Sequence, residues 1–401
     1  MTTKDNLMAE NATPRFIVKV SPQGASRLKT GHLWVYRSDI VSSGDAPPGS
    51  VVTVTDHRGK PLGTALYSST SQIAIRLLSH DPAIDVSALL RQRIADAIAY
   101  REAVVRNTDA YRVIFSEADG LPGLIVDRYS DILTLQILTQ SIDSDPVRQL
   151  LVSELSDRLK PNSIVERVDP RVRELENLPP RDSGLIQGDK TSTVITMNGI
   201  QFHRDALQGQ KTGAFLDQRE NYSAAAQFAR GDALDVFCYH GGFALHLAPH
   251  CSSVTGVDSS RPALEAADRN AELNHQEVEW IEANAFDLLK DYSASDHLYD
   301  TIVLDPPAFA KTRRDLDAAM RGYKELNLRA LKMLRPGGFL ISCSCSYHVS
   351  QSDFLEMLAS AGRDAHRQLR LVELRSQAKD HPILPGVPET SYLKCAIIFV
   401  S

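Results

Sequence analysis

The stretch Leu234-Asp-Val-Phe-Cys-Tyr-His-Gly-Gly-Phe-Ala-Leu-His-Leu-Ala248 decides the fold of this chain. Its pattern predicts a short buried strand, a tight turn at Gly241-Gly242 and the first turns of a helix. Glycines between a strand and a helix N-terminus let the backbone approach a bound small molecule closely. Further on, Ser253-Val-Thr-Gly-Val-Asp258 predicts a second strand ending on an acid, and a carboxylate there can hold the diol of a ribose. Together the two segments predict a site for a nucleoside-containing cofactor.

From about residue 233, strand and helix patterns alternate, which is typical of a parallel sheet with helices on both faces. The expected strands are 234–238, 254–258, 278–282, 301–305 and 339–344. Two later apolar runs, 369–374 and 393–400, have no helix between them and are expected to pair as an antiparallel edge. This layout is that of a class I methyltransferase, an α/β Rossmann-like fold. The turn at Gly241-Gly242 also lacks the G-x-G-x-x-G of NAD enzymes.

The earlier part of the chain predicts a tail and two further domains, so the protein is multidomain. Residues 1–13 are polar and charged and are expected to form a flexible tail. Short alternating runs separated by turn-forming residues predict a small β-barrel over residues 14–84. A helical pattern, a β-meander and a hairpin at Asn198-Gly199 predict an α+β middle domain over residues 85–205. Residues 206–401 then form the α/β domain.

Composition and charge narrow the class of protein. No apolar run approaches the roughly 20 residues needed to span a bilayer, and the cysteines form no CxxC pair, so we expect a cytoplasmic protein without disulfides or a metal site. The formal net charge of −6 argues against indiscriminate binding to polyanions. Residues 14–84, however, carry eight basic and four acidic side chains. This is the charge of an RNA-binding surface, or of a basic surface that has no partner.

Two segments carry candidate reactive groups. Asp305-Pro-Pro-Ala-Phe309 closes the fourth expected strand, and its prolines remove two backbone donors and hold the loop extended. The Asp305 carboxylate is therefore expected to face the reactive group of the cofactor. Cys345 follows the fifth strand near the same cleft, where a thiolate would be a strong carbon nucleophile. A cysteine in a strand is also often a small packing residue, so the residues alone leave both interpretations of Cys345 open.

Taken together, the motifs resemble a bacterial family of 23S ribosomal RNA methyltransferases that form 5-methylcytosine. The resemblance spans about Arg15 to the C-terminus. It rests on His32-Leu-Trp-Val-Tyr36, Glu117-Ala-Asp-Gly-Leu-Pro-Gly-Leu-Ile-Val-Asp-Arg-Tyr129, Lys211-Thr-Gly-Ala-Phe-Leu-Asp-Gln-Arg219, Asp235-Val-Phe-Cys-Tyr-His-Gly-Gly-Phe243, Asp305-Pro-Pro-Ala-Phe309, Arg321-Gly-Tyr-Lys-Glu-Leu-Asn327 and Ser344-Cys-Ser346. It implies an RNA-binding PUA domain, an α+β middle domain and a catalytic domain that uses S-adenosylmethionine (SAM).

The resemblance also implies which residues hold the cofactor. They are Phe215, Asp217 and Arg219 around the SAM pocket, Asp235, Tyr239 and Gly241 on the methionine and ribose side, Asp258 at the ribose hydroxyls, and Asn284 and Asp305. Asn284 stands where such enzymes commonly carry an aspartate near the adenine amine, and its amide oxygen can accept the same hydrogen bond. Ala308 stands where some relatives have lysine, and Lys311 is the candidate to supply that charge.

In the implied reaction, Cys345 attacks carbon 6 of a cytosine, and Asp305 stabilises charge at the ring nitrogen 3 or accepts from the exocyclic amine. The target base must be unstacked, so the expected partner is a single-stranded or opened region of 23S ribosomal RNA. Three alternatives stay open: an exocyclic-amine methyltransferase, which has no use for Cys345, a non-catalytic RNA-binding assembly factor, and a small-molecule methyltransferase. The oligomeric state also stays open, with a homodimer among the options.

Overall fold

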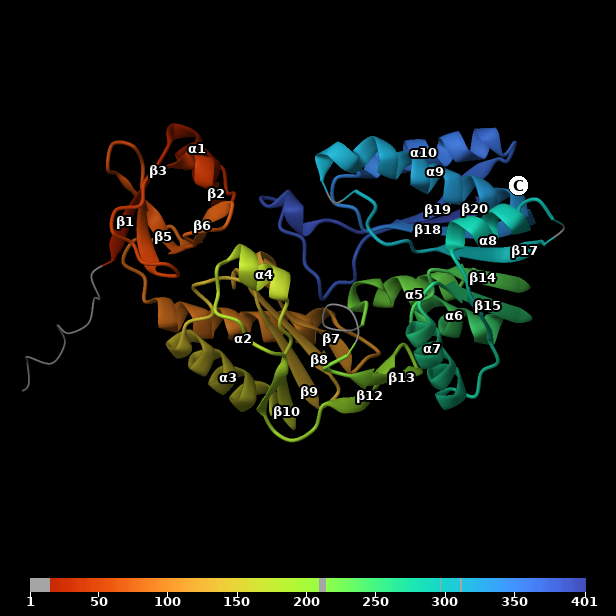
Figure 1. Ribbon diagram of the computed structural model, residues 1–401, viewed down its shortest axis with the longest axis horizontal. Coiled ribbons are helices and arrows are strands. Elements are labelled where there is room, and N and C mark those ends of the chain that lie inside the picture. Colours follow the sequence, from red (N-terminus) through yellow and green to blue (C-terminus); the bar gives the residue numbers. More distant parts are fainter. Residues whose placement is uncertain (1–14, 209–213, 296, 311) are drawn as a thin grey trace, which may run out of the picture.

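The computed structural model describes residues 15–208, 214–295, 297–310 and 312–401. The expected tail, Lys211 and Lys311 lie outside the described residues. Figure 1 shows an N-terminal part and a C-terminal part on either side of a gap, with the middle part below and between them. Within the described residues no helix is long and apolar enough to cross a membrane.

The N-terminal part is a six-stranded sheet around its own core. Its strands are β1 (Phe16–Val20), β2 (Trp34–Tyr36), β3 (Ile40–Ser42), β4 (Val51–Thr55), β5 (Pro61–Tyr67) and β6 (Ile73–Ser79), in the order β2-β6-β5-β4-β1-β3. Strands β1 and β4 are parallel and the other pairs are antiparallel. Helix α1 (Pro22–Lys29) begins at Ser21, whose hydroxyl accepts from Gly24 N. The buried side chains of Leu28, Val35, Val54 and Ile75 belong to this core.

The middle part combines helices with two sheets, as an α+β domain does. The larger sheet has the order β11-β10-β9-β8-β7, with β7 (Ala110–Phe115), β8 (Leu124–Tyr129), β9 (Ile132–Ile137), β10 (Ser163–Glu166) and β11 (Gly184–Gln187). Helices α2 (Val86–Val104) and α3 (Asp145–Leu159) pack on this sheet, and α4 (Pro170–Leu175) follows β10 (Figure 1). Strands β12 (Ser192–Met197) and β13 (Ile200–Asp205) form the predicted hairpin, which turns at Asn198-Gly199.

The C-terminal part is the predicted class I fold. Its seven-stranded sheet has the order β16-β15-β14-β17-β18-β20-β19. The strands are β14 (Asp232–Val236), β15 (Ser253–Asp258), β16 (Glu279–Glu282), β17 (Tyr299–Leu304), β18 (Leu334–Ser344), β19 (Leu369–Arg375) and β20 (Lys394–Val400). Strands β14 to β18 are parallel. Strands β19 and β20 pair antiparallel at the end of the sheet, as expected, with β20 antiparallel to β18 and β19 outermost.

Helices cover both faces of this sheet (Figure 1). They are α5 (Arg219–Ala226), α6 (Gly242–Leu247) and α7 (Arg261–Leu273) on one face, and α8 (Ala285–Tyr292), α9 (Leu316–Met333) and α10 (Gln351–Asp364) on the other. Strand β14 lies between β15 and β17, so the strand order changes direction at β14. The carboxyl ends of these strands therefore flank a crevice, which is where ligands bind in such sheets.

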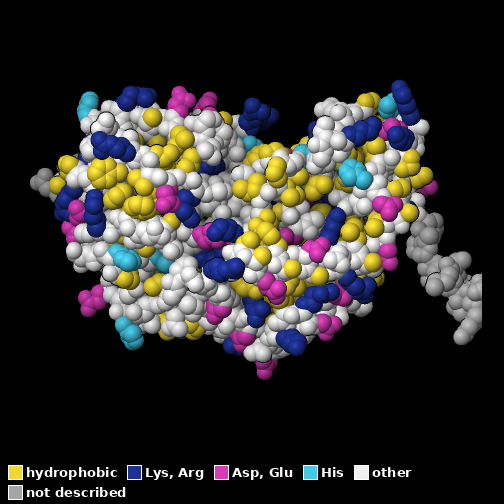
Figure 2. Space-filling view, turned by 180° about the vertical axis from the view of Figure 1, so that it is seen from behind, with side chains coloured by type: hydrophobic (Ala, Val, Ile, Leu, Met, Phe, Trp, Pro, Cys, Tyr) yellow, Lys and Arg dark blue, Asp and Glu magenta, His cyan; other side chains and the backbone are white. Residues whose placement is uncertain are grey.

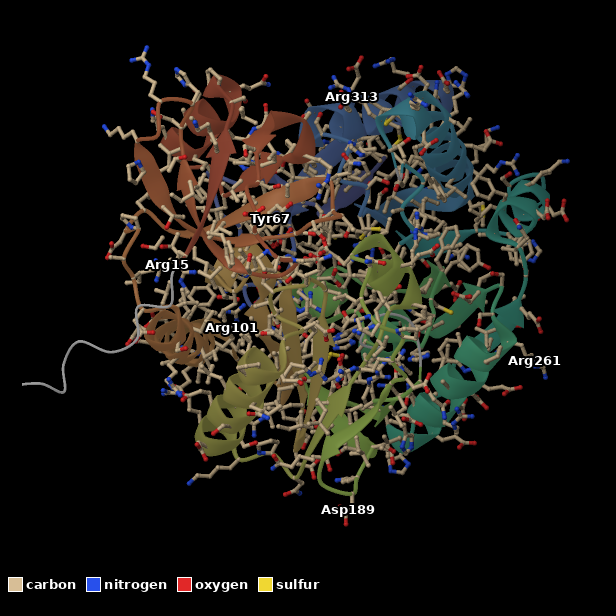
Figure 3. All side chains as sticks on the ribbon, turned by 60° about the vertical axis from the view of Figure 1, so that its left-hand side comes forward. Arg15, Tyr67, Arg101, Asp189, Arg261 and Arg313 are labelled. Carbon is tan, nitrogen blue, oxygen red and sulfur yellow. The ribbon has the colours of Figure 1, made fainter. Side chains whose placement is uncertain are left out.

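The segment between β19 and β20, residues 376–393, fastens the C-terminal part to the other two. Asp380 accepts a hydrogen bond from Arg112 N at 2.8 Å in the middle part. Glu389 lies 3.2 Å from His32 Nε2 in the N-terminal part. Arg101, on α2 and labelled in Figure 3, donates to Asp380 O at 2.7 Å and is buried. These contacts fix how the three parts meet around the crevice.

Candidate active site

A cavity of about 320 Å³ lies at the carboxyl ends of β14, β15 and β17 and beside the end of β18. The expected site residues that line it are Phe215, Asp217, Tyr239, Asp258, Asp305 and Cys345. The hairpin β12–β13 of the middle part contributes Ile195, Met197 and Phe202. The cavity is thus a shared feature of the middle and C-terminal parts.

The turn after β14 is held in an uncommon backbone conformation. Phe237, Tyr239 and Gly241 have φ values of 69°, 48° and 81°. Tyr239 N donates to Asp258 Oδ2 at 3.0 Å, which ties this turn to the end of β15. A Cβ atom on Gly242 would lie 2.6 Å from the Tyr222 ring, so the close approach of α6 needs a glycine there. Strain of this kind persists where the surrounding structure enforces it, and it clusters at binding sites.

Three carboxylates converge behind and around the turn. Asp235 is fully buried, and its Oδ2 accepts from Ala244 N at 2.8 Å in the first turn of α6. Its Oδ1 has no hydrogen-bond partner within the described residues. Burial raises the pKa of Asp235 to about 8, and the nearby carboxylates of Asp305 and Asp258 act in the same direction. Such a cluster fits a ligand that carries positive charge, and SAM carries both an ammonium and a sulfonium.

The reactive end of the cavity joins two loops. Asp305 follows β17, and its Oδ1 accepts from Gln218 Nε2 at 2.9 Å. Cys345 follows β18 and is half-buried, with its Sγ 3.9 Å from Pro306 O. Ser346 Oγ lies 2.9 Å from the Tyr323 hydroxyl and accepts from Ala310 N at 3.2 Å. The Asp305-Pro-Pro loop and the Cys345 loop are therefore held against each other.

Cys238 also lines the cavity, on the cofactor side. It is buried, and burial raises the pKa of its thiol well above the usual value. A thiol that stays protonated is a poor nucleophile. Cys238 is therefore a packing residue next to the turn rather than a second candidate nucleophile.

Two expected cavity residues have other contacts. The Arg219 side chain is buried away from the cavity, with Nη1 2.8 Å from Asp380 Oδ2. Asn284 begins α8, and its Oδ1 accepts from the backbone N–H groups of Phe286 and Asp287 at 2.9 and 3.3 Å. Neither side chain is among the described residues that line the cavity, and the expected roles of Arg219 and Asn284 toward the cofactor stay predictions. Gly241 and Asp235 support the turn from outside the cavity lining.

Several residues of the site were not singled out in the sequence. Gln218 and Tyr323 lie within motifs that carry the family resemblance, so their motifs were visible although their roles were not. Tyr392 donates to Asp217 Oδ2 at 2.6 Å from the segment between β19 and β20. No local pattern marks Tyr392, because its partner is 175 residues away.

The fold and the cavity define a class I SAM-dependent methyltransferase with an N-terminal PUA-like domain. Residues 180–399 match the family model of S-adenosylmethionine-dependent methyltransferases, and residues 18–80 match that of PUA-like domains. The solved structure of SMU.776, a putative methyltransferase complexed with SAH, superposes with a TM-score of 0.81 at 20 % identity. The match covers 96 % of this chain and 100 % of that one, and at this identity it shows the fold.

Relatives of higher identity define the family. The chain is 38 % identical over 390 residues to ribosomal RNA large subunit methyltransferase I of Shewanella denitrificans, which covers 94 % of this chain and 97 % of the relative. It is 39 % identical over 389 residues to the protein of the same name from Shewanella amazonensis, with the same coverage. The chain belongs to the ribosomal RNA large subunit methyltransferase I family.

Proposed function

We propose that this protein methylates carbon 5 of a cytosine in 23S ribosomal RNA, with SAM as the methyl donor and Cys345 as the nucleophile. One observation carries the proposal: the Cys345 thiol and the Asp305 carboxylate line one cavity with Asp258, the expected ribose ligand. The names of the relatives support large-subunit ribosomal RNA as the substrate. An enzyme that methylates an exocyclic amine would have no use for a cysteine in this place.

In the proposed reaction, the Cys345 thiolate forms a bond to carbon 6 of the cytosine, and the electron pair of the 5–6 double bond shifts toward carbon 5. Carbon 5 would take the methyl group that SAM supplies, activated by its sulfonium, and the S–CH3 bond would break to leave S-adenosylhomocysteine. Asp305, oriented by Gln218, stabilises positive charge at the ring nitrogen 3 or accepts from the exocyclic amine. A base then takes the carbon 5 proton, and the bond between sulfur and carbon 6 breaks, which restores Cys345.

We propose that residues around the turn after β14 bind SAM. Asp235 fixes the first turn of α6 and Asp258 fixes the turn through Tyr239 N. We propose that Asp258 also accepts from the ribose hydroxyls and that Phe215, Asp217 and Tyr239 close the pocket around the methionine end. The carboxylates of Asp258 and Asp305, which line the cavity, support a cationic ligand.

The proposed domains are residues 14–84, 85–205 and 206–401, with RNA binding assigned to the first. Several arginines of this domain, which were expected to face RNA, form contacts within the protein instead. Arg27 pairs with Asp39 at 3.0 Å, Arg76 lies near Glu117 and Glu176, and Arg37 donates to backbone carbonyls. The exposed basic side chains left on this domain include Lys29, Arg58 and Lys60. On the face seen in Figure 2, Lys and Arg side chains are spread widely and do not form one patch.

Mapping of modified cytosines in 23S ribosomal RNA tests the proposal. Bisulfite sequencing or mass spectrometry should find one 5-methylcytosine that is present in cells with this protein and absent in cells without it. Cells with the Cys345→Ala protein should lack the mark as well. Full methylation by Cys345→Ala would overturn the proposed chemistry, and a methyl group on an exocyclic nitrogen would favour the amine methyltransferase.

A further inference from the structure

Lys394 is a buried lysine at the start of β20. It is 8 % exposed, and its Nζ donates to Ser346 O at 2.6 Å and to Tyr392 O at 2.9 Å. Burying an ammonium is costly unless an opposite charge compensates it. Two backbone carbonyls accept hydrogen bonds from the Lys394 ammonium, which has three donors, and neither carbonyl supplies a negative charge. Among the described residues no carboxylate forms an ion pair with it.

The pairing of β18 with β20 places this ammonium beside Cys345. Ser344, the last residue of β18, is the register partner of Lys394. The chain continues from Ser344 through Cys345 to Ser346, whose carbonyl accepts from Lys394. Burial lowers the pKa of Lys394 to about 8, and negative charge on Cys345 acts in the opposite direction. An ionised Cys345 therefore favours the charged form of this lysine.

We propose that Lys394 is a positioning residue for the nucleophile: its ammonium holds the backbone next to Cys345 and stabilises the thiolate form of that side chain. This inference rests on the proposed role of Cys345 in methyl transfer. A cation near a cysteine lowers the thiol pKa, which raises the thiolate fraction at neutral pH. No bond other than S–H changes, and the proton passes to solvent.

The other titratable groups around Cys345 make a cation useful there. Asp305 lies on the neighbouring loop and lines the same cavity, so its carboxylate opposes a second negative charge. Tyr323, on α9, contacts Ser346 Oγ, and burial raises the pKa of its hydroxyl, with Cys345 acting in the same direction. Tyr323 therefore stays neutral at pH 7. The Lys394 ammonium, which donates to Ser346 O, adds a positive charge on the other side of the Cys345 loop.

The test is the pH dependence of Cys345 alkylation in the full-length protein. Iodoacetamide labels thiolates, and peptide mass spectrometry separates Cys345 from the half-buried Cys251 and from the buried cysteines. The variants are Lys394→Gln and Lys394→Met, which remove the charge, and Lys394→Arg, which keeps it. Lys332→Gln is the matched control, because Lys332 is exposed at the end of α9, next to the opposite end of β18.

We expect the midpoint of Cys345 alkylation to rise by about 1–2 pH units in Lys394→Gln and Lys394→Met. The Cys345 labelling rate at pH 7 should fall about tenfold or more, while Lys394→Arg should restore most of it and Lys332→Gln should match the wild type. Unchanged midpoints in both neutral variants, with SAM binding retained in calorimetry, would overturn the inference. If only one neutral variant folds, its midpoint alone decides.

This result is separable from the proposed function. Unchanged alkylation midpoints together with an inactive Cys345→Ala protein would remove the role of Lys394 and leave the nucleophile in place. An active Cys345→Ala protein would remove the proposed function even if Lys394 did shift the thiol pKa.

Discussion

Gln218 Nε2 donates to Asp305 Oδ1 over 2.9 Å, which connects the segment before α5 to the loop after β17. The side-chain oxygen Oε1 of Gln218 accepts a hydrogen bond from Asn221 Nδ2 at 2.7 Å, so the orientation of the Gln218 amide is fixed. One carboxylate oxygen of Asp305 is therefore held in a set direction. This contact orients the acidic group of the proposed reaction.

Replacing Gln218 should lower the rate of methyl transfer. Gln218→Leu removes a hydrogen bond to a charged group, worth about 1.5–3 kcal/mol, so kcat/KM for RNA should fall about 10- to 100-fold. The rate of transfer of a tritiated methyl group from SAM to RNA gives kcat/KM for each variant. Gln227→Leu, at an exposed position after α5, is the control and should keep the wild-type rate. Equal rates for the two variants would mean that Asp305 needs no orientation by Gln218.

Asp235 should make the stability of the ligand-free protein depend on pH. Its pKa is raised to about 8 in the folded state, so between about pH 4 and 8 the folded protein holds a proton that the unfolded chain releases. The free energy of unfolding should therefore fall with rising pH, by up to about 1.4 kcal/mol per pH unit from this group. Asp235→Asn should remove that slope in urea denaturation and weaken SAM binding. A slope shared by both proteins would contradict the prediction.

The buried pair of Arg219 and Asp380 should matter for stability. Asp380→Asn leaves the Arg219 guanidinium buried with a neutral partner, and we expect a loss of about 3–5 kcal/mol in the free energy of unfolding. Glu265→Gln is the control, because Glu265 and its partner Arg261, labelled in Figure 3, are exposed and such pairs contribute at most about 1 kcal/mol. Comparable losses in both variants would contradict this assignment.

The pair of Arg219 and Asp380 should also make the free energy of unfolding fall at acid pH. Burial favours the neutral form of Asp380, but His381 and Arg219 outweigh it and hold the pKa of the carboxyl far below its usual value. The stabilisation is therefore complete above the usual pKa of an aspartate, about 4, and is lost as the pH falls below it. Urea denaturation between pH 5 and 2, expressed relative to Asp380→Asn, measures the effect. A constant difference over that range would argue against it.

The exposed lysines of the N-terminal domain should control RNA affinity but not cofactor affinity. The double variant Lys29→Glu and Lys60→Glu should weaken binding to 23S ribosomal RNA and reduce the slope of log K against log salt by about 2. SAM affinity in calorimetry should stay the same. Lys290→Glu, on the exposed side of α8, is the single-site control. Unchanged RNA binding in the double variant would place the RNA on another surface.

The parts of the fold that could be predicted are those that local patterns encode. Alternating strand and helix patterns predict strands β14 to β18 and their parallel orientation, because each unit buries its own apolar face. The insertion of β20 between β18 and β19 depends on pairing between distant strands, which a local pattern does not report. The contact of Arg219 with Asp380, 161 residues away, is hidden from a local pattern for the same reason. Asn284 begins α8 and its side chain caps that helix, a contact that the position after a strand does not by itself predict.

The formation of a covalent bond between Cys345 and RNA is the most direct test of the proposed function. In 23S ribosomal RNA transcribed with 5-fluorocytidine, carbon 5 carries a fluorine that a base cannot remove as a proton, so the reaction should stop at the covalent stage. We predict a SAM-dependent complex of protein and RNA in denaturing gels, with the methylated nucleotide attached to Cys345 by peptide mass spectrometry, and no complex with Cys345→Ala. A wild-type protein that methylates ordinary RNA but forms no such complex, or a complex that persists in Cys345→Ala, would contradict the proposal.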